Sequence, residues 1–377
     1  MNDIKTDNNH IDVSKLPPEI KHKFNLIKEV GEEIVTEKEI IDLLTQDKEL
    51  LAYDGFEPSG IIHLPQGIMR AININKMIEA GFRFKILVAD WHAKANLKYG
   101  GDIEKIRIAG KYFIEVWKAS GMNLDKVEFV WADDLVKEPG YWDLVMEIAT
   151  KVNLPRVLRT VQIMGRSEKD TLTASQIIYP LMQVTDIFKL NVDVAQLGMD
   201  QRKVNMLARE IAPEIGYKKP VVVSHKMLLG LLPPKEGTEN ESVVDRAIRM
   251  KMSKSIPDSS IFMTDDEETV NRKIKKAWCP EGVVEENPIL EYSKYLIFNK
   301  YDELLIERPE KYGGDVLYKS YGELERDFAE KKLFPLDLKL AVAKYINDML
   351  DPVRKHFEED ENAKKLKEQV ESFKVTR

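Results

Sequence analysis

The chain has 377 residues, of which 43% are hydrophobic and 32% are charged. This composition is typical of a globular protein with room for two domains, and it excludes fibrous, collagen-like and wholly disordered proteins. Because 57 Lys and Arg oppose 64 Asp and Glu, for a net charge of -7, any contact with nucleic acid must use local patches. The one cysteine, Cys279, excludes a disulfide framework and favours a reducing compartment, which we expect to be the cytoplasm.

Targeting, membrane and metal signals are weak along the chain. The first ten residues lack an apolar stretch behind a basic start, so we expect no secretory signal. The longest uncharged apolar stretches fall short of the ~20 residues that a membrane helix needs. The six histidines are scattered, and none lies at a metal-ligand spacing from Cys or Glu. We therefore predict no protein-bound metal and no membrane contact.

Short β-rich runs alternate with helical patterns from residue 49 to residue 268, which predicts a Rossmann-like, doubly wound α/β domain with a parallel sheet. Three helical stretches without a strand between them, at about 139–190, indicate a helical insertion of the kind that forms a cap or a subunit contact. The expected strands are 50–56, 82–90, 127–133, 192–198 and 220–224, and the expected helices between them include 66–80, 103–119 and 200–212.

Two further regions flank this domain. Residues 1–48 show helical patterns only, and we expect an N-terminal helical segment there. After residue 268 helical patterns dominate, so 269–377 is predicted to be an all-α C-terminal domain. A Pro, Glu and Ser-rich segment at 233–247 indicates a mobile excursion. The expected C-terminal helices are 270–277, 288–298, 321–329, 336–350 and 353–373.

His63 and Gln66 follow the first strand of the sheet, at the edge where α/β proteins bind ligands. We expect a helix to begin near Pro65 and to carry both side chains on one face of its first turn, within reach of a phosphate. Neither a GxGxxG nor a GxxxxGK[ST] motif occurs, so dinucleotide-binding and P-loop proteins lose their main support. A cap or an ordinary surface pair is the alternative.

The string KMSKS at 251–255 places Lys251 and Lys254 three residues apart. Two ammonium groups at this spacing can bind a polyphosphate as point charges. A solvated loop explains the same string. Further upstream, Gly198 and Asp200 follow a strand and open a helix, again at a ligand-binding edge, although Asp200 could instead cap that helix.

Tyr179, Gln183 and Asp186 share one face of a predicted helix whose other positions are almost all apolar. Buried polar groups need partners, and a bound small molecule would supply them. An internal network in which these side chains satisfy one another is equally compatible with the pattern.

Five segments together carry a family resemblance: YDGFEPSG at 53–60, IIYPLMQVTDI at 177–187, LGMDQRKVNMLARE at 197–210, KMSKS, and KYGGD at 311–315. Over roughly residues 30–355 the chain resembles a tyrosyl-tRNA synthetase of the archaeal and eukaryotic type, in class I. It departs from the His-Ile-Gly-His form of the first class signature at Leu64, Pro65 and Gln66. Gln66 keeps a hydrogen bond to a triphosphate possible but lacks the charge of a second histidine.

The resemblance implies two reaction steps. Tyrosine and ATP form tyrosyl-adenylate and pyrophosphate, and the tyrosyl group then passes to the terminal ribose of tRNA-Tyr. His63, Gln66, Lys251 and Lys254 would stabilise the phosphates, with Mg²⁺ accompanying ATP. The residues implied to bind tyrosine are Tyr53 and Asp186 at the phenol, Tyr179, Gln183 and Gln201 at the ammonium, and Gly55 and His92 along the pocket wall; Gly198 and Asp200 are implied at the ATP ribose.

For tRNA, the resemblance implies a homodimer whose inserted helices guide the acceptor end and whose C-terminal domain binds the anticodon. Arg159 and Arg202 match positions that contact the first acceptor base pair. Tyr312 and Asp337 match positions that stack on and hydrogen-bond the first anticodon base. Without the resemblance, all four would pass as ordinary surface residues.

Three other functions remain compatible with these motifs. A tryptophanyl-tRNA synthetase shares the fold and both signatures, but Tyr53 together with Asp186 favours a phenol over an indole. An RNA-binding paralogue that lost aminoacylation has only Pro65 and Gln66 in its support. A nucleotidyltransferase that adenylates another acid would not need the C-terminal domain with Tyr312.

Overall fold

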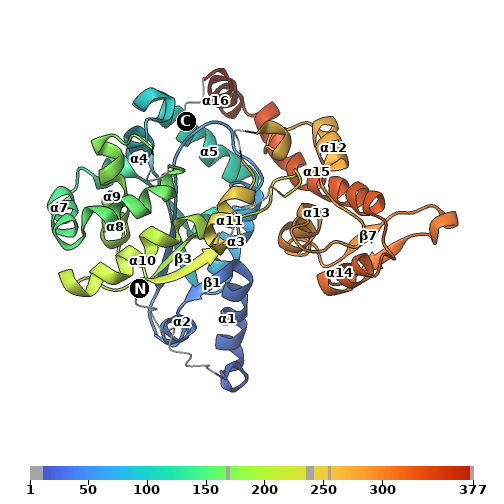
Figure 1. Cartoon of the computed structure of the whole chain (residues 1–377), viewed down its shortest axis with the longest axis horizontal. Helices are drawn as coiled ribbons and strands as arrows, with labels where there is room; N and C mark the ends of the chain where they lie inside the picture. The colour runs from blue at the N-terminus through green and yellow to red at the C-terminus, as the bar shows by residue number, and fades with distance from the viewer. Residues whose placement is uncertain (1–11, 167–169, 235–241, 254–255, 374–377) are drawn as a thin grey trace.

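The computed structural model describes residues 12–166, 170–234, 242–253 and 256–373. A larger lobe surrounds a central sheet, and the C-terminal helices build most of a second, smaller lobe beside it (Figure 1). Lys254 and part of the predicted excursion at 233–247 lie outside the described residues; the end of that excursion is helical instead, in α11 (Val243–Met250). Within the described ranges no helix is long and apolar enough to span a bilayer.

Six strands form the central sheet in the order β1-β6-β5-β2-β3-β4. The five strands from β2 to β6 run parallel and match the five segments expected from the sequence, with β6 ending one residue later, at His225. The chain builds outward in one direction from β2 to β4 and in the other from β5 to β6, so the switch point of a doubly wound sheet lies between β2 and β5. The strands are β1 (Gly31–Val35), β2 (Leu50–Phe56), β3 (Phe82–Val88), β4 (Val127–Trp131), β5 (Val194–Gly198) and β6 (Val221–His225).

Strand β1 was not expected, because residues 1–48 were predicted to be helical throughout. It pairs antiparallel with β6, from Gly31 opposite His225 to Val35 opposite Val222, and so makes the sheet mixed. Its sequence, GEEIV, contains two charged residues and a glycine, so the β-propensity signal is weak. Such residues suit an edge strand, since charge there discourages pairing with another chain. The N-terminal segment is therefore part of the sheet and not a separate helical unit.

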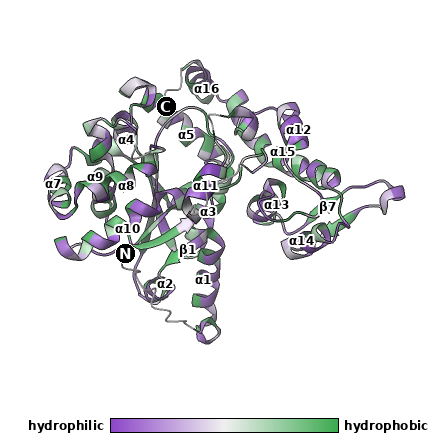
Figure 2. Ribbon diagram, viewed as in Figure 1, coloured by the Kyte–Doolittle hydropathy of each residue, from purple (hydrophilic) through white to green (hydrophobic). Residues whose placement is uncertain are grey.

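Side chains along β2 alternate between the two faces of the sheet. Ala52 and Phe56 join one hydrophobic core, whereas Tyr53 joins a second core on the opposite face. Hydrophobic residues accordingly follow the central strands in Figure 2. The helices around the sheet are α1 (Pro18–Val30), α2 (Glu37–Leu44), α3 (Ile68–Glu79), α4 (Asp90–Ala95), α5 (Ile103–Ala119), α6 (Ala132–Leu135) and α10 (Arg202–Ile211).

Helix α5 illustrates how sequence fixes one of these crossovers. Asp102 caps its N-terminus by accepting hydrogen bonds from the backbone N–H groups of Glu104 and Lys105. Its apolar positions recur at helical spacing and end in Trp117. The ring centroid of Trp117 lies 4.8 Å from that of Phe56, and the Trp117 ring stacks on the ring of Phe129 in strand β4. The observed span, residues 103–119, is the one predicted.

The expected insertion is present and consists of α7 (Tyr141–Lys151), α8 (Leu154–Thr160) and α9 (Ala174–Lys189). A capping box between Thr173 and Gln176 starts α9, and Pro180 is accommodated inside it. Because α9 packs against α4, α7, α8 and α10, it buries polar as well as apolar side chains. This helix carries the three polar residues predicted to share a face.

The C-terminal region is mainly helical, as expected, with one addition. Strands β7 (Leu304–Ile306) and β8 (Val316–Tyr318) form a two-stranded antiparallel sheet, and three-residue strands are too short to give a periodic signal. The sequence predicted separate helices at 336–350 and 353–373, with a break near Pro352. That break is absent, because buried Val353 and Phe357 continue the apolar face of the helix past the proline. The helices are α12 (Glu267–Lys276), α13 (Pro288–Tyr292), α14 (Tyr321–Ala329), α15 (Pro335–Glu359) and α16 (Glu361–Ser372).

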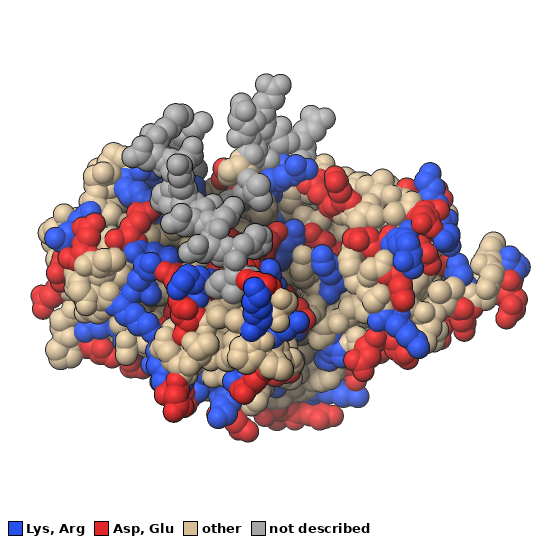
Figure 3. All heavy atoms as spheres, turned by 90° about the horizontal axis from the view of Figure 1, so that it is seen from below, with Lys and Arg blue, Asp and Glu red and all other residues tan. Residues whose placement is uncertain are grey.

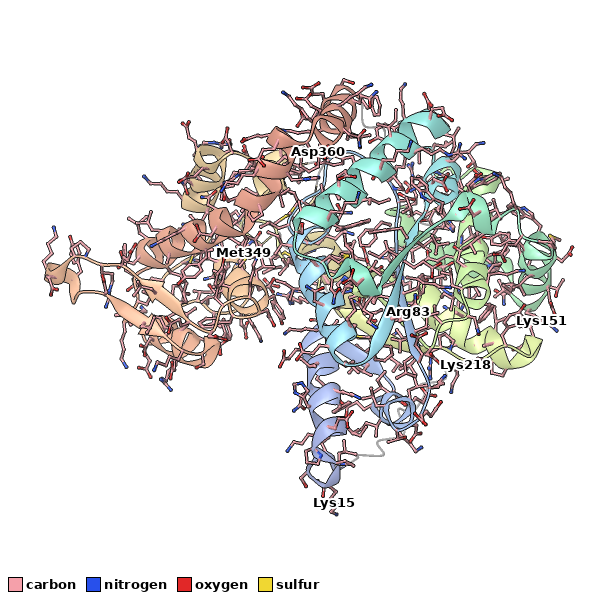
Figure 4. All side chains as sticks on the ribbon, turned by 180° about the vertical axis from the view of Figure 1, so that it is seen from behind. Lys15, Arg83, Lys151, Lys218, Met349 and Asp360 are labelled. Carbon is pink, nitrogen blue, oxygen red and sulfur yellow. The ribbon has the colours of Figure 1, made fainter. Side chains whose placement is uncertain are left out.

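Helices α15 and α16 connect the two lobes. In Figure 4, α15 passes Met349 in the smaller lobe and ends at Asp360 beside the larger one. Asp360 caps α16 by accepting from the N–H of Ala363 at 2.8 Å, and α16 then packs along α5. His356 also pairs with Glu115 of α5 at 2.9 Å. The C-terminal helices thus hold the smaller lobe against the sheet domain.

Candidate active site

A cavity of about 280 Å³ opens at the carboxyl ends of β2 and β5, beside the switch point of the sheet. Its wall also includes residues of α9, of the turn after β2 and of the segment before α12. Every predicted tyrosine, ATP and catalytic residue within the described part of the chain lines it; these are Tyr53, Gly55, His63, Gln66, His92, Tyr179, Gln183, Asp186, Gly198, Asp200, Gln201 and Lys251. The predicted Lys254 lies outside the described residues.

His63 and Gln66 do line the cavity, but not from the first turn of a helix. Helix α3 begins at Ile68, because Gly67 has φ -96° and ψ -94°, outside the helical region. The two residues instead belong to a turn in which the N–H of Gln66 donates to the carbonyl of His63 at 2.9 Å. Gln66 Oε1 is buried without a hydrogen bond from the described residues, which leaves it available to a ligand.

The same turn is joined to the segment that follows KMSKS. His63 forms a β-bridge with Phe262, and the N–H of Leu64 donates to the carbonyl of Ile261 at 3.0 Å. An added Cβ at Gly67 would lie 2.2 Å from the sulfur of Met263, so this approach requires glycine. The first signature and the segment after the second, nearly 200 residues apart in the sequence, therefore meet in space.

Asp186 lies at the inner end of the cavity and has no exposed surface. Its Oδ1 accepts a hydrogen bond from the hydroxyl of Tyr141 at 2.8 Å, and its Oδ2 lies 2.9 Å from His92 Nε2. Asp186 thus has internal partners, but they are Tyr141 and His92 and not the Tyr179 and Gln183 of the alternative network. Tyr53 stays outside it, because its buried hydroxyl lacks a hydrogen bond of good geometry among the described residues, with Gln183 close by.

Burial and the charges around the inner end of the cavity shift the pKa values of Tyr53 and His92. Burial, followed by the carboxylates of Asp186 and Asp54, raises the pKa of the Tyr53 hydroxyl well above its usual value. Burial is the largest single effect on His92 and lowers its pKa, but the hydrogen bond and charge of Asp186 together with the charges of Glu57 and Asp90 outweigh it, and the pKa is raised from 6.5. Tyr53 therefore remains a hydrogen-bond donor, and the cavity offers both a donor and an acceptor to a ligand hydroxyl.

The wall beside Tyr179 is lined with amide and carboxylate groups. Gln183 Nε2 donates to Gln201 Oε1 at 3.2 Å, and Gln201 Nε2 donates to the carbonyl of Ile163 at 3.1 Å. Glu57 lies near Tyr179: burial first, and then the charge of Glu57, raises the pKa of the Tyr179 hydroxyl well above its usual value. Oxygen atoms of this kind suit an ammonium group.

Asp200 and Lys251 meet at the other end of the cavity, with Lys251 Nζ 2.7 Å from Asp200 Oδ2. Asp200 lies in the short 3-10 helix Met199–Gln201 and does not cap α10, whose N-cap is Gln201. A Cβ at Gly198 would lie 2.7 Å from Asp200 Oδ1, so glycine gives this carboxylate its room. At Gly55 a Cβ would meet Leu87 only at 3.7 Å, so protein packing alone does not require glycine there.

Comparison with known proteins agrees with this geometry. The family model "tRNA synthetases class I (W and Y)" matches residues 45–351. A cytoplasmic tyrosine–tRNA ligase of Arabidopsis thaliana is 50% identical over 366 residues, which cover 96% of this chain and 91% of that protein. The crystal structure of a tyrosyl-tRNA synthetase from Pyrococcus horikoshii, complexed with L-tyrosine, has a TM-score of 0.86 at 39% identity and covers 93% of this chain and 99% of that one.

The chain belongs to the class I tyrosyl-tRNA synthetases. A tryptophanyl-tRNA synthetase from Encephalitozoon cuniculi shares the fold, with a TM-score of 0.66, but only 17% of the sequence; it covers 94% of this chain and 90% of that one. The tryptophanyl alternative is therefore far weaker than the tyrosyl family.

This synthetase also has a buried polar cluster that the motifs did not predict. Asp54 pairs with Arg70 at 2.5 Å, Arg70 Nη1 lies 2.8 Å from His225 Nε2, and Gln196 Nε2 lies 2.7 Å from His225 Nδ1. Burial raises the pKa of Asp54 to about 7 although Arg70 and the N–H of Gly55 oppose it. Burial and the charge of Arg70 hold the pKa of His225 well below its usual value.

The cluster was missed because its members come from β2, α3, β5 and β6, which lie far apart in the sequence. One signal was present in the sequence. Because successive side chains of β2 point to opposite faces of the sheet, Tyr53 points into one core and Asp54 points toward α3. Glu57 likewise lies within the motif YDGFEPSG, but no role was predicted for it. Tyr141, in the insertion, had no motif around it.

The four predicted tRNA residues of the synthetase lie on the surface, apart from the cavity. Arg159 is exposed on α8, whereas Arg202 is held by Glu33 of β1 through contacts of 2.5 and 2.8 Å. Tyr312 is 63% exposed, and Asp337 lies in the first turn of α15. Acidic and basic side chains are interleaved over the face seen in Figure 3.

Proposed function

We propose that this protein is a tyrosine–tRNA ligase whose cavity activates L-tyrosine with ATP and whose surface presents tRNA-Tyr to the activated amino acid. The carboxylate of tyrosine attacks the α-phosphate of ATP and pyrophosphate leaves. The terminal ribose of the tRNA then takes the tyrosyl group. The proposal rests on one observation: a buried hydrogen-bond donor, the Tyr53 hydroxyl, and a buried acceptor, the Asp186 carboxylate, both line the closed end of the cavity.

Tyr53 and Asp186 would bind the phenolic hydroxyl of the substrate from two sides. The protonated Tyr53 donates a hydrogen bond to it, and the Asp186 carboxylate accepts one from it. Phenylalanine would leave both groups buried and unpaired, which is the costly case for a polar site. A site built to bond a substrate hydroxyl rejects the analogue without it by ~10⁴ to 10⁵, a magnitude for which tyrosyl-tRNA synthetase is itself the standard example.

Tyr179, Gln183 and Gln201 would bind the ammonium group of tyrosine, with Glu57 adding negative charge nearby. Gly55 and His92 complete the wall, and the absence of a side chain at Gly55 leaves width for an aromatic ring. These assignments are supported by the place of all these residues on the wall of one cavity.

The ATP end requires no enzyme nucleophile. Gly198 and Asp200 would bind the ribose, while His63, Gln66, Lys251 and Lys254 would stabilise the charge that develops on the phosphates. Positioning and electrostatic stabilisation then supply the catalysis. The contact between the His63 turn and the segment after KMSKS supports a common role for both signatures.

Mg²⁺ would accompany the phosphates of ATP. This ion binds phosphate oxygens and keeps several waters, and it seldom needs an all-protein cage. Asp200 lies beside one of the proposed phosphate-binding side chains and is already paired with it, Lys251, so the residues suit a metal carried by ATP. When bound, the ion would neutralise charge on the departing pyrophosphate.

The tRNA would contact Arg159 and Arg202 at its acceptor end and Tyr312 and Asp337 at its anticodon. Arg308 supports the second pair: it bonds the carbonyl of Gly314 in the Tyr312 loop and that of Lys332, just before α15. The exposed ring of Tyr312 suits stacking on an unpaired base.

A homodimer through the inserted helices completes the proposal. Four large apolar side chains there are more than a third exposed, namely Met146, Leu154, Trp142 and Ile178. Exposed apolar groups of this size on one insertion are typical of a protein interface. We place the enzyme in the cytoplasm, where the chain's one cysteine would stay reduced.

Charging of tRNA tests the complete proposal. Purified protein is incubated with ATP, Mg²⁺, a tRNA-Tyr transcript and labelled tyrosine or tryptophan. We expect label from tyrosine alone, and Tyr312→Ala should slow charging while leaving amino-acid-dependent pyrophosphate exchange unchanged. Exchange without any charging would instead indicate an adenylating enzyme that does not use this tRNA.

A further inference from the structure

Tyr141 contacts the proposed specificity residue from behind. It is the first residue of α7, has no exposed surface and does not line the cavity. Its hydroxyl donates to Asp186 Oδ1 at 2.8 Å, and the carbonyl of Met182 lies 3.4 Å away. Gly140, in the left-handed conformation with φ +74°, starts the helix and fixes where Tyr141 enters the core.

The two contacts of Asp186 with the protein use different oxygens of its carboxylate. Tyr141 bonds Oδ1, and His92 lies 2.9 Å from Oδ2. A carboxylate has about four lone-pair sites, so acceptor capacity remains for a ligand after these two contacts. Since the contacts are made at different oxygens, they also fix the plane of the group.

We propose that Tyr141 is a positioning residue for substrate selection, which holds Asp186 as an oriented acceptor for the phenolic hydroxyl of tyrosine. This inference rests on the role proposed above for Asp186. A carboxylate only accepts hydrogen bonds, and one held in a fixed plane accepts them from fixed directions. An acceptor that cannot donate needs a substrate that donates, which tyrosine does and phenylalanine does not.

The test is Tyr141→Phe, which removes one oxygen and keeps the buried ring. Exchange of labelled pyrophosphate into ATP is measured with tyrosine and with phenylalanine. We expect kcat/KM for tyrosine, and with it the ratio of tyrosine to phenylalanine, to fall about tenfold, the order expected for one hydrogen bond to a charged group. The loss should lie in KM for tyrosine, with KM for ATP unchanged.

Thr185→Val is the matched control. Thr185 neighbours Asp186 on α9, is equally buried and donates its hydroxyl to the carbonyl of Leu181 at 2.9 Å. This variant also loses one buried hydroxyl, but not one that contacts the carboxylate, so its ratio of tyrosine to phenylalanine should stay within twofold of the parent. Should Tyr141→Phe not fold, Tyr141→Met fills the space and lacks the same donor.

Asp186→Asn separates this inference from the site assignment on which it depends. If Asp186→Asn lowers the ratio but Tyr141→Phe leaves it unchanged, the role of Tyr141 is wrong and that of Asp186 stands. If Asp186→Asn leaves the ratio unchanged, both are wrong. In the double variant, Tyr141→Phe should have less than a twofold further effect, because the group that it positions is gone.

Discussion

Lys251 and Asp200, 51 residues apart in the sequence, form an ion pair of 2.7 Å at the ATP end of the cavity. Both groups are proposed to bind ATP, the lysine at the phosphates and the carboxylate at the ribose. In the protein alone each satisfies the other. ATP must therefore exchange this pair for its own contacts, so nucleotide binding and the Lys251–Asp200 pair compete.

Replacing Lys251 by glutamine should lower kcat for pyrophosphate exchange by about 10² to 10³, the usual effect of losing one preorganised charge-stabilising group. The variant leaves Asp200 without its ammonium partner, yet the fold should survive because Lys251 is partly exposed. Lys219→Gln, which breaks a surface pair with Glu39 away from the cavity, is the control. A Lys251→Gln enzyme as fast as the parent would remove this lysine from the mechanism.

Gly198→Ala should raise KM for ATP about tenfold with little change in KM for tyrosine. The added methyl group would lie 2.7 Å from Asp200 Oδ1 and 2.8 Å from the sulfur of Met227, so the carboxylate must move. Steady-state exchange kinetics with each substrate varied in turn measure the split. Gly322→Ala, where the methyl group meets no atom within 4 Å, should leave both constants unchanged; equal loss for both substrates in Gly198→Ala would indicate general damage to the site.

Arg70→Met should destabilise the fold by about 3–5 kcal/mol, the typical cost of removing one partner of a buried ion pair. The loss should grow with pH. The folded pKa of Asp54 is about 7, above its usual 3.8, so its burial lowers stability as pH rises between these values. Without Arg70 the folded pKa rises further, and stability keeps falling above pH 7.

Urea unfolding at pH 6, 7 and 8 measures this trend for Arg70→Met. The double variant with Asp54→Asn serves as its control, since it has no carboxylate to titrate and its loss relative to the parent should not grow in this way. If the free energies of unfolding of Arg70→Met and the parent differed by the same amount at pH 6, 7 and 8, Asp54 would keep its charge without the arginine.

His92 should contribute stability that is lost at alkaline pH. Its folded pKa is raised above 6.5, because Asp186, and then Glu57 and Asp90, outweigh the effect of burial. The contribution is complete below about pH 6.5 and disappears as pH rises through the higher folded pKa. The stability advantage of the parent over His92→Gln should therefore shrink above pH 6.5 in urea unfolding, and an advantage that grows would reverse the sign of this linkage. His22→Gln, at an exposed histidine of α1, is the control.

Much of the fold was predictable because its signals are local. The five parallel strands are β-rich runs bounded by turns, and α5 has both a cap and an apolar period. Strand β1 was not predicted, because an edge strand with two glutamates gains its structure from pairing with β6 and not from its own β-propensity. The start of α3 was misplaced by three residues, because the contact between Gly67 and Met263 is not visible in either segment alone.

The candidate site was predictable for the opposite reason: its residues sit in motifs whose order is characteristic of one family. Twelve of the predicted residues line a single cavity. The supporting cluster of Asp54, Arg70 and His225, and the contact of Tyr141 with Asp186, depend on side chains from distant segments. Their individual types give no hint of a partner until the sheet brings them together.

Amino-acid-dependent exchange of labelled pyrophosphate into ATP, run with tyrosine, tryptophan and phenylalanine on the parent and on Asp186→Ala, tests the central claim most directly. The account predicts exchange with tyrosine alone in the parent and loss of that exchange in the variant. Exchange driven by tryptophan, or full tyrosine exchange in Asp186→Ala, would contradict it.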